Sequence, residues 1–196
     1  NERNSKLKPL TEQLKTTEKA QNELNAAVSK RAELKLAHYR TSWTRPKVDR
    51  TGTTETFEAV QAKFVRFLCD AADANPQSKS FRIDEFEVWS AETPKNVALA
   101  SAGARASGKA RINEDFPGVY GPQLAIDGKT GARFISASNE LTIELVKPTK
   151  INRIVFSSAK GETIPNHRKF SFVADYRIQV SLDGENWTEI ASGSDR

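Results

Sequence analysis

The chain of 196 residues contains one cysteine, two histidines and no methionine, and these shortages exclude several classes of protein. The single Cys69 cannot form an internal disulfide, and it rules out a CxxC metal or redox motif and a CxxCH haem site. Cys69 lies in the apolar stretch KFVRFLC, which favours an inert core thiol over a reactive one. No apolar run approaches the roughly 20 residues that a membrane-spanning helix needs, so we expect no membrane insertion.

Signatures of catalysis are missing as well. Ser/His/Asp chemistry needs a base within hydrogen-bond reach of a nucleophile, and the chain offers only His38 and His167 as imidazole bases. It has no G-x-S-x-G nucleophile elbow, no G-x-G-x-x-G loop and no P-loop. We therefore expect a protein that is not an enzyme.

The start of the chain carries no visible signal peptide. Two interpretations are open: either a signal peptide has been removed, or the chain is a piece of a longer protein. The lack of methionine, even at position 1, favours the second interpretation.

The positive charge is concentrated near the start of the chain. Residues 1–50 hold 12 Lys and Arg against 6 Asp and Glu, whereas residues 51–196 hold 18 against 19. Nucleic-acid binding typically uses a basic face with interleaved aromatic residues on a folded domain. The basic segment here has acids among its bases and few aromatics, so we expect no nucleic-acid partner.

Residues 1–40 form a predicted helical segment, with the helix itself over 5–40. No Gly or Pro lies between positions 10 and 40. The apolar residues recur at spacings that suit a helix, namely Leu7, Leu10, Leu14, Leu24, Val28 and Leu34. This stripe is too narrow for burial in a core, and it favours one arm of a helical hairpin or coiled coil whose mate lies outside the chain. A solvated linker helix is the alternative.

Residues 41–56 read as a linker, and from Phe57 the pattern changes to a period of two. The stretches AKFVRFLC and FRIDEFEVW alternate apolar and polar residues, as antiparallel strands do. Further short strand patterns follow, separated by turn signals. Residues 57–196 are therefore predicted to form an all-β sandwich, which makes the chain mainly β with a long N-terminal α-helix.

Four stretches in this order carry a family resemblance: NVALAS, AIDG, LTIELVKPTKINRIVF and DYRIQVSLDGENWTEIA. Over about residues 94–193 they resemble the discoidin, or coagulation factor 5/8 type C, domain. The resemblance implies a jelly-roll β-sandwich of the galactose-binding-like fold.

The order of the strands departs from that family. Family members carry two further strands after the Asp-Gly-Trp hairpin, whereas the matching patterns here, at 62–67 and 82–89, come first. We interpret this as a circular permutation of the same sandwich, which neighbouring chain ends at the surface make easy. The same order also resembles a segment of large exported planctomycete proteins that carry cytochrome-c-like domains.

The resemblance also implies a metal site. Asp127-Gly128 matches the family's Asp-Gly loop, which in many members helps to hold a structural Ca²⁺, and Glu85 matches a terminal-strand glutamate that supplies another oxygen. Ca²⁺ requires several oxygen ligands. Ala132 and Phe134 stand where the family pattern has Thr and Trp, which weakens the site. A plain Asx turn at Asp127 is the alternative.

Family members bind ligands through loops at one end of the sandwich, with aromatic platforms and planar polar groups. The corresponding candidates here are Phe116, Tyr120, Arg133, Asn166, His167 and Arg168. The alternative for each of them is a purely structural role, and for His167 it is an ordinary position in an exposed loop. Trp89 and Trp187 lie in alternating strands and are predicted core residues, and Trp43 is predicted to pin the helix onto the sandwich.

These observations predict a non-catalytic binding module that recognises a glycan or polysaccharide. The alternative is a structural or protein-interaction domain with no glycan ligand, which docks other domains of the parent protein through the helix. The resemblance further implies an exported protein, in the periplasm or at the cell surface.

Overall fold

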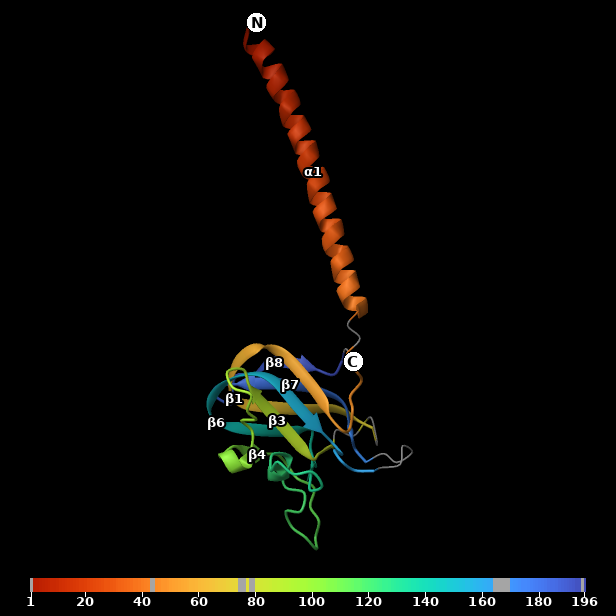
Figure 1. Ribbon diagram of the computed structural model, residues 1–196, viewed down its shortest axis with the longest axis vertical. Coiled ribbons are helices and arrows are strands. Elements are labelled where there is room, and N and C mark those ends of the chain that lie inside the picture. Colours follow the sequence, from red (N-terminus) through yellow and green to blue (C-terminus); the bar gives the residue numbers. More distant parts are fainter. Residues whose placement is uncertain (1, 43–44, 74–76, 78–79, 164–169, 195) are drawn as a thin grey trace. The chain divides into compact units, whose positions relative to one another are not determined.

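The computed structural model describes residues 2–42, 45–73, 77, 80–163, 170–194 and 196 (Figure 1). The chain divides into two compact units, Asn1–Arg45 and Pro46–Arg196, which are described separately below.

The first unit is one helix, α1 (Glu2–Ser42). It confirms the helix expected from the apolar spacing and extends slightly beyond both predicted ends. Leu14, Leu24 and Val28 of the apolar stripe are about 60% exposed within this unit. An isolated helix gains little stability from propensity alone. Packing of this apolar stripe against a partner would therefore stabilise α1 most.

The second unit is built from strands, which confirms the period-two prediction. They are β1 (Thr53–Ala72), β2 (Arg82–Ile83), β3 (Glu85–Ser90), β4 (Arg105–Ser107), β5 (Phe134–Ile135), β6 (Glu140–Ser157), β7 (Val173–Ser181) and β8 (Thr188–Ser192), with 3-10 turns η1 (Ala100–Ala102) and η2 (Pro122–Ala125). Within the described residues the main sheet is antiparallel with the order β3-β6-β1-β7-β8, and β4 also pairs with β6. A separate short ladder joins β2 and β5.

Two long strands turn this sheet into a sandwich. The first half of β1 pairs with the second half of β6, as Thr53 opposite Phe156 shows, and β3 extends that layer. The second half of β1 pairs with the first half of β6 and with β7, as Phe67 opposite Leu141 and Ile178 shows. Register shifts between these halves mark β-bulges, which bend a strand and increase its twist. Both strands therefore belong to both layers.

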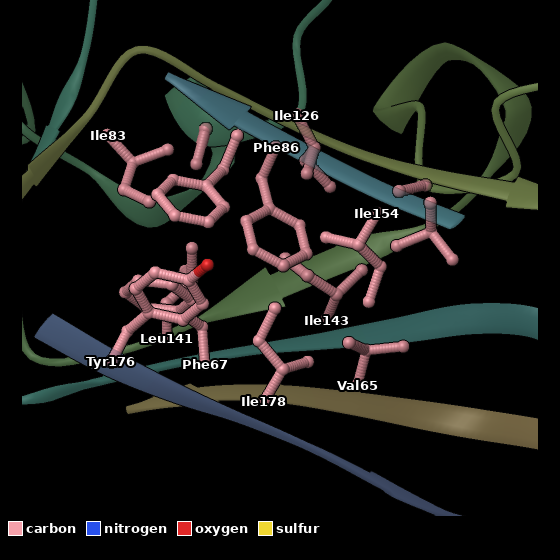
Figure 2. Packing of buried hydrophobic residues seen from close by; sticks show 14 of the residues in the cluster. Val65, Phe67, Ile83, Phe86, Ile126, Leu141, Ile143, Ile154, Tyr176 and Ile178 are labelled. Atoms are coloured by element: carbon pink, nitrogen blue, oxygen red, sulfur yellow. The ribbon is translucent and has the colours of Figure 1, made fainter. Parts of the chain in front are cut away.

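The core fills the space between the two layers (Figure 2). Phe67 is central, because its ring contacts Phe81, Phe86, Phe156 and Tyr176 at centroid distances of 5.0–5.8 Å. Figure 2 shows Phe86 and Ile154 facing Phe67 and Ile178 across this space. The predicted β-sandwich is thus confirmed as the fold class.

A buried polar network closes the sandwich next to Pro46. The side chains of Arg196 and Glu55 are 6% and 5% exposed, and they form an ion pair with an N···O distance of 2.8 Å. Arg196 also donates to the carbonyl oxygens of Pro46 and Thr54, at 2.7 Å each. The Tyr176 hydroxyl donates to Glu55, and burial raises the pKa of Tyr176, so the phenol stays neutral. Both ends of this unit therefore meet at one place.

Several details differ from the sequence prediction. Strand β1 begins at Thr53, inside the predicted linker 41–56, because Thr53 already lies in register with β6. The prediction that Trp89 and Trp187 are core residues is wrong: both are half-buried and carry an arginine against the ring. Cys69 is fully buried, as predicted. Trp43 lies outside the described residues.

Candidate functional site

The Asp-Gly loop follows η2 and has the geometry of an Asx turn. The backbone N–H of Lys129 donates to Oδ1 of Asp127 at 2.8 Å. Gly128 has a φ of 76°, and a Cβ at this position would lie 3.2 Å from the Leu99 side chain. The turn therefore needs glycine for both its backbone conformation and its packing.

Glu85, at the start of β3, is buried beside this loop. Neither carboxylate oxygen of Glu85 accepts a hydrogen bond of normal geometry from any described residue, and the residue is 5% exposed. The pKa of Glu85 is raised to about 7, chiefly by burial and then by the neighbouring carboxylates of Asp127 and Glu87. The nearby N–H of Gly128 and the Lys160 ammonium act in the opposite direction. A buried carboxylate without partners is costly, which points to a missing counter-charge.

The surroundings of Glu85 limit what that counter-charge can be. Glu87 is half-buried and receives the Trp89 indole N–H at 2.9 Å, with the Lys160 ammonium 3.6 Å from its other oxygen. No three Asp, Glu, His or Cys side chains converge on one point in the described part of the chain. A cation at Glu85 and Asp127 would therefore complete its shell with backbone oxygens and water, which Ca²⁺ accepts readily.

The loop of residues 108–121 presents the first predicted ligand residues. Phe116 is 67% exposed, and Ile112 and Val119 of the same loop are 82% and 43% exposed. The side chain of Asn113 accepts the backbone N–H groups of Asp115 and Phe116, which shapes the turn before Phe116. In Figure 1 this loop, in green, extends away from the strands.

Tyr120 and Arg133 are more constrained. Tyr120 is half-buried, and its carbonyl oxygen accepts the Ile135 N–H at 3.4 Å, which ties the end of the loop to β5. The Arg133 guanidinium forms an ion pair with Glu162, which also receives Arg82 at 3.0 Å, and it donates to the carbonyl oxygen of Gly131. Arg133 is thus engaged with protein groups.

The remaining predicted ligand residues, Asn166, His167 and Arg168, lie outside the described residues. Next to them, Phe170 is 41% exposed, whereas Phe172 is buried with Arg50 and Arg82 over its ring. The side chain of His38 is likewise not among those described.

Sequence reasoning missed a groove on the outer face of β3, β6 and β1. It has a volume of about 470 Å³, and Trp89, Arg153 and Phe57 are among its lining residues. The signal that could have revealed it is the alternation in β3. Phe86 and Val88 are buried in the core, so Trp89 must share the outer face with Glu87.

In the described part of the chain, no helix is both long enough and apolar enough to cross a membrane.

Comparison with known protein families finds a similarity over part of the sandwich. Residues 104–195 match a family model described as the F5/8 type C domain. No curated protein and no solved structure matches the chain significantly. The matched segment contains β4 to β8, so β1 and β3 lie before it in sequence although they pair with its strands β6 and β7.

Proposed function

Because residues 104–195 match the F5/8 type C family model, we propose that the chain is a non-catalytic module that recognises a glycan through loops at one end of the sandwich. Domains of this family are generally carbohydrate- or protein-binding modules and are typical of extracellular proteins. The observation that carries the proposal is the exposed Phe116 on the loop of residues 108–121. Sugar rings stack on such aromatic faces.

A structural Ca²⁺ is part of this proposal. Glu85 and Asp127 would hold the ion, because the two buried oxygens of Glu85 accept no hydrogen bond of normal geometry from the described residues, and Asp127 is close enough to raise the pKa of Glu85. When bound, the ion supplies the positive charge that the buried carboxylate lacks. Its effect would be to fix the Asp127–Gly128 turn and the adjoining end of η2.

The second candidate function is protein recognition by the same loop. Ile112 and Val119 are exposed beside Phe116, and aliphatic side chains bury more favourably against a protein than against a sugar. In this version α1 docks other domains of a larger exported protein through Leu14, Leu24 and Val28, which are exposed within their unit.

A glycan-binding screen with and without Ca²⁺ tests the proposal. Phe116→Ala should abolish glycan binding, whereas Ile112→Ala, a matched change in the same loop, should retain it. Loss of binding in both variants would mean that the apolar surface of the loop as a whole holds the glycan, and that stacking on Phe116 alone does not explain it. A His167→Ala/Arg168→Ala double variant tests whether the neighbouring loop contributes. If wild-type protein binds no glycan in either condition, glycan recognition at these loops is excluded.

A further inference from the structure

The groove on the outer face of the β3–β6–β1 layer has the features of a ligand site. Its lining residues are Thr56, Phe57, Trp89, Ser90, Ala91, Glu92, Thr93, Pro94, Asn152 and Arg153. Its volume of about 470 Å³ lies in the range of roughly 300–1,000 Å³ that is usual for small-molecule sites. None of these residues belongs to the loop of residues 108–121.

The groove exists because the strands bend at this point. Trp89 and Thr56 lie opposite Arg153 on either side of β6, so the three residues form one row across the layer. Beyond that row the pairing resumes only at Ile151, so Asn152 has no partner on either side. Such bulges interrupt a ladder and re-aim side chains, which opens the surface beside Trp89.

Arg153 is held in place yet has its donors unused. Its guanidinium lies 4.3 Å from the centre of the Trp89 ring. Among the described residues it forms no hydrogen bond or ion pair. Arg66 is the instructive comparison, because it lies 4.0 Å from the Trp187 ring but donates twice to the Gln179 side chain. A cation–π contact leaves the N–H donors available at the rim of the guanidinium, so Arg153 is prepared to receive a planar acceptor.

The local charge favours an anion. The exposed residues Lys95 and Lys150 flank the groove, because their carbonyl oxygens accept the N–H groups of Ser90 and Ala91, which line it. Together with Arg153 they outweigh Glu92 of the lining and the neighbouring Glu87, whose carboxylate pairs with Lys160. Among anions, a carboxylate fits the Arg153 guanidinium best, since it binds a guanidinium through two parallel hydrogen bonds.

The outer edge of β3 excludes one common way of binding a peptide. Trp89 forms a bridge with Asn96, and the N–H groups of Ser90 and Val97 donate to Lys95 and Val88. This edge is therefore already paired and cannot accept an added strand. The neutral hydroxyl and amide groups of Thr56, Thr93 and Asn152 instead suit the hydroxyls of a sugar.

We propose that this groove binds an acidic saccharide, with a uronate carboxylate on Arg153 and the sugar ring against the apolar walls of Phe57, Trp89 and Pro94. This site is distinct from the loop site proposed above and does not rest on it.

Titration calorimetry in low salt tests this site. It measures the binding of trimeric galacturonate, glucuronate and mannuronate. We expect at least one trimer to bind. The Arg153→Gln variant should bind this trimer with an affinity at least about tenfold lower, because the carboxylate has lost its charged partner. Arg66→Gln is the matched control, and we expect it to change the affinity less than about twofold. The methyl-esterified trimer should bind at least about tenfold more weakly, because it has lost the carboxylate charge.

Three results would overturn the proposal: no uronate trimer binds, Arg153→Gln binds as tightly as wild type, or pentaglutamate binds as tightly as the best trimer. The last result would mean that the groove recognises charge on a peptide. If Arg153→Gln does not fold, Asn152→Ala at the exposed bulge takes its place, and we expect it to weaken binding several-fold. Retained binding in Phe116→Ala, together with a negative neutral-glycan screen, would support the groove while excluding the loop site.

Discussion

The buried contact between Arg196 and Glu55 gives the most direct test of the described structure. In Arg196→Met the ion pair is lost, together with the hydrogen bonds to the carbonyl oxygens of Pro46 and Thr54. Glu55, whose side chain is 5% exposed, would then lose the Arg196 guanidinium. The Tyr176 hydroxyl would remain as its donor.

The size of the effect follows from burial. Removing one partner of a buried pair costs roughly 3–5 kcal/mol, because the other charge stays buried without compensation. In domains of about 150 residues each kcal/mol lowers Tm by about 2–4 °C, so we expect Tm to fall by roughly 6–20 °C. Arg177→Met is a matched control: Arg177 pairs with Asp70 through two bonds of 2.8 and 2.9 Å, but its side chain is 42% exposed. Exposed pairs contribute only about 0–1 kcal/mol.

Urea unfolding followed by circular dichroism measures both variants, and a double-mutant cycle with Glu55→Gln isolates the pair. In the Glu55→Gln background the same Arg196→Met change should cost at least about 1 kcal/mol less, since no charge is left uncompensated. The reasoning is refuted if Arg196→Met costs no more than Arg177→Met, or if its cost is the same in both backgrounds.

Three further predictions concern the core and the candidate metal site. Phe67→Ala should cost about 3–5 kcal/mol, because the central ring leaves a cavity in a core that cannot collapse freely. Gly193→Ala should be destabilising by about 1–3 kcal/mol, because its Cβ would lie 3.1 Å from the buried Tyr176 ring. For Glu85, whose pKa of about 7 exceeds the ordinary 4.5, the folded state retains a proton that the unfolded chain has lost. In chelator, the contribution of Glu85 to stability should therefore be complete below about pH 4.5 and be lost as the pH rises through 7, a fall of up to roughly 3 kcal/mol relative to Glu85→Gln.

Each of these has a clear contrary outcome in urea unfolding. A loss below about 1 kcal/mol in Phe67→Ala would contradict its central place in the core. Wild-type stability in Gly193→Ala would mean that the Tyr176 ring moves aside. For Glu85, a pH dependence that persists in Glu85→Gln would assign it to another group, and Ca²⁺ should raise wild-type stability at pH 8 but not that of the variant.

The strands were predictable because their apolar residues alternate. The stretch KFVRFLC places Val65, Phe67 and Cys69 on one face, and these residues are buried in the core. The bends were not predictable, since a bulge depends on pairing with a distant partner and leaves no local signature. The sandwich was predicted to begin at Phe57 with a strand pattern at 62–67, whereas β1 is one strand that starts at Thr53 and crosses both layers.

The candidate site was predictable only in part. The Asp127 turn and the exposed Phe116 follow from local residues, but the burial of Glu85 depends on the loop that covers it. Arg133 was predicted as a ligand-binding residue, and its pairing with Glu162 arises from a contact between distant segments. The circular permutation stays a prediction, which is supported by the pairing of β1 and β3 with strands of the matched segment.

The passage of β1 and β6 through both layers has a consequence for cooperativity. In a sandwich of two separate sheets, one layer can open while the other survives. Here the backbone of each long strand contributes hydrogen bonds to both layers. Separating the strands of one layer therefore also disrupts the hydrogen bonds of the other layer. Amide hydrogens of Val65 and Ile154, in opposite layers, should therefore exchange with solvent through global unfolding, with the same free energy of opening.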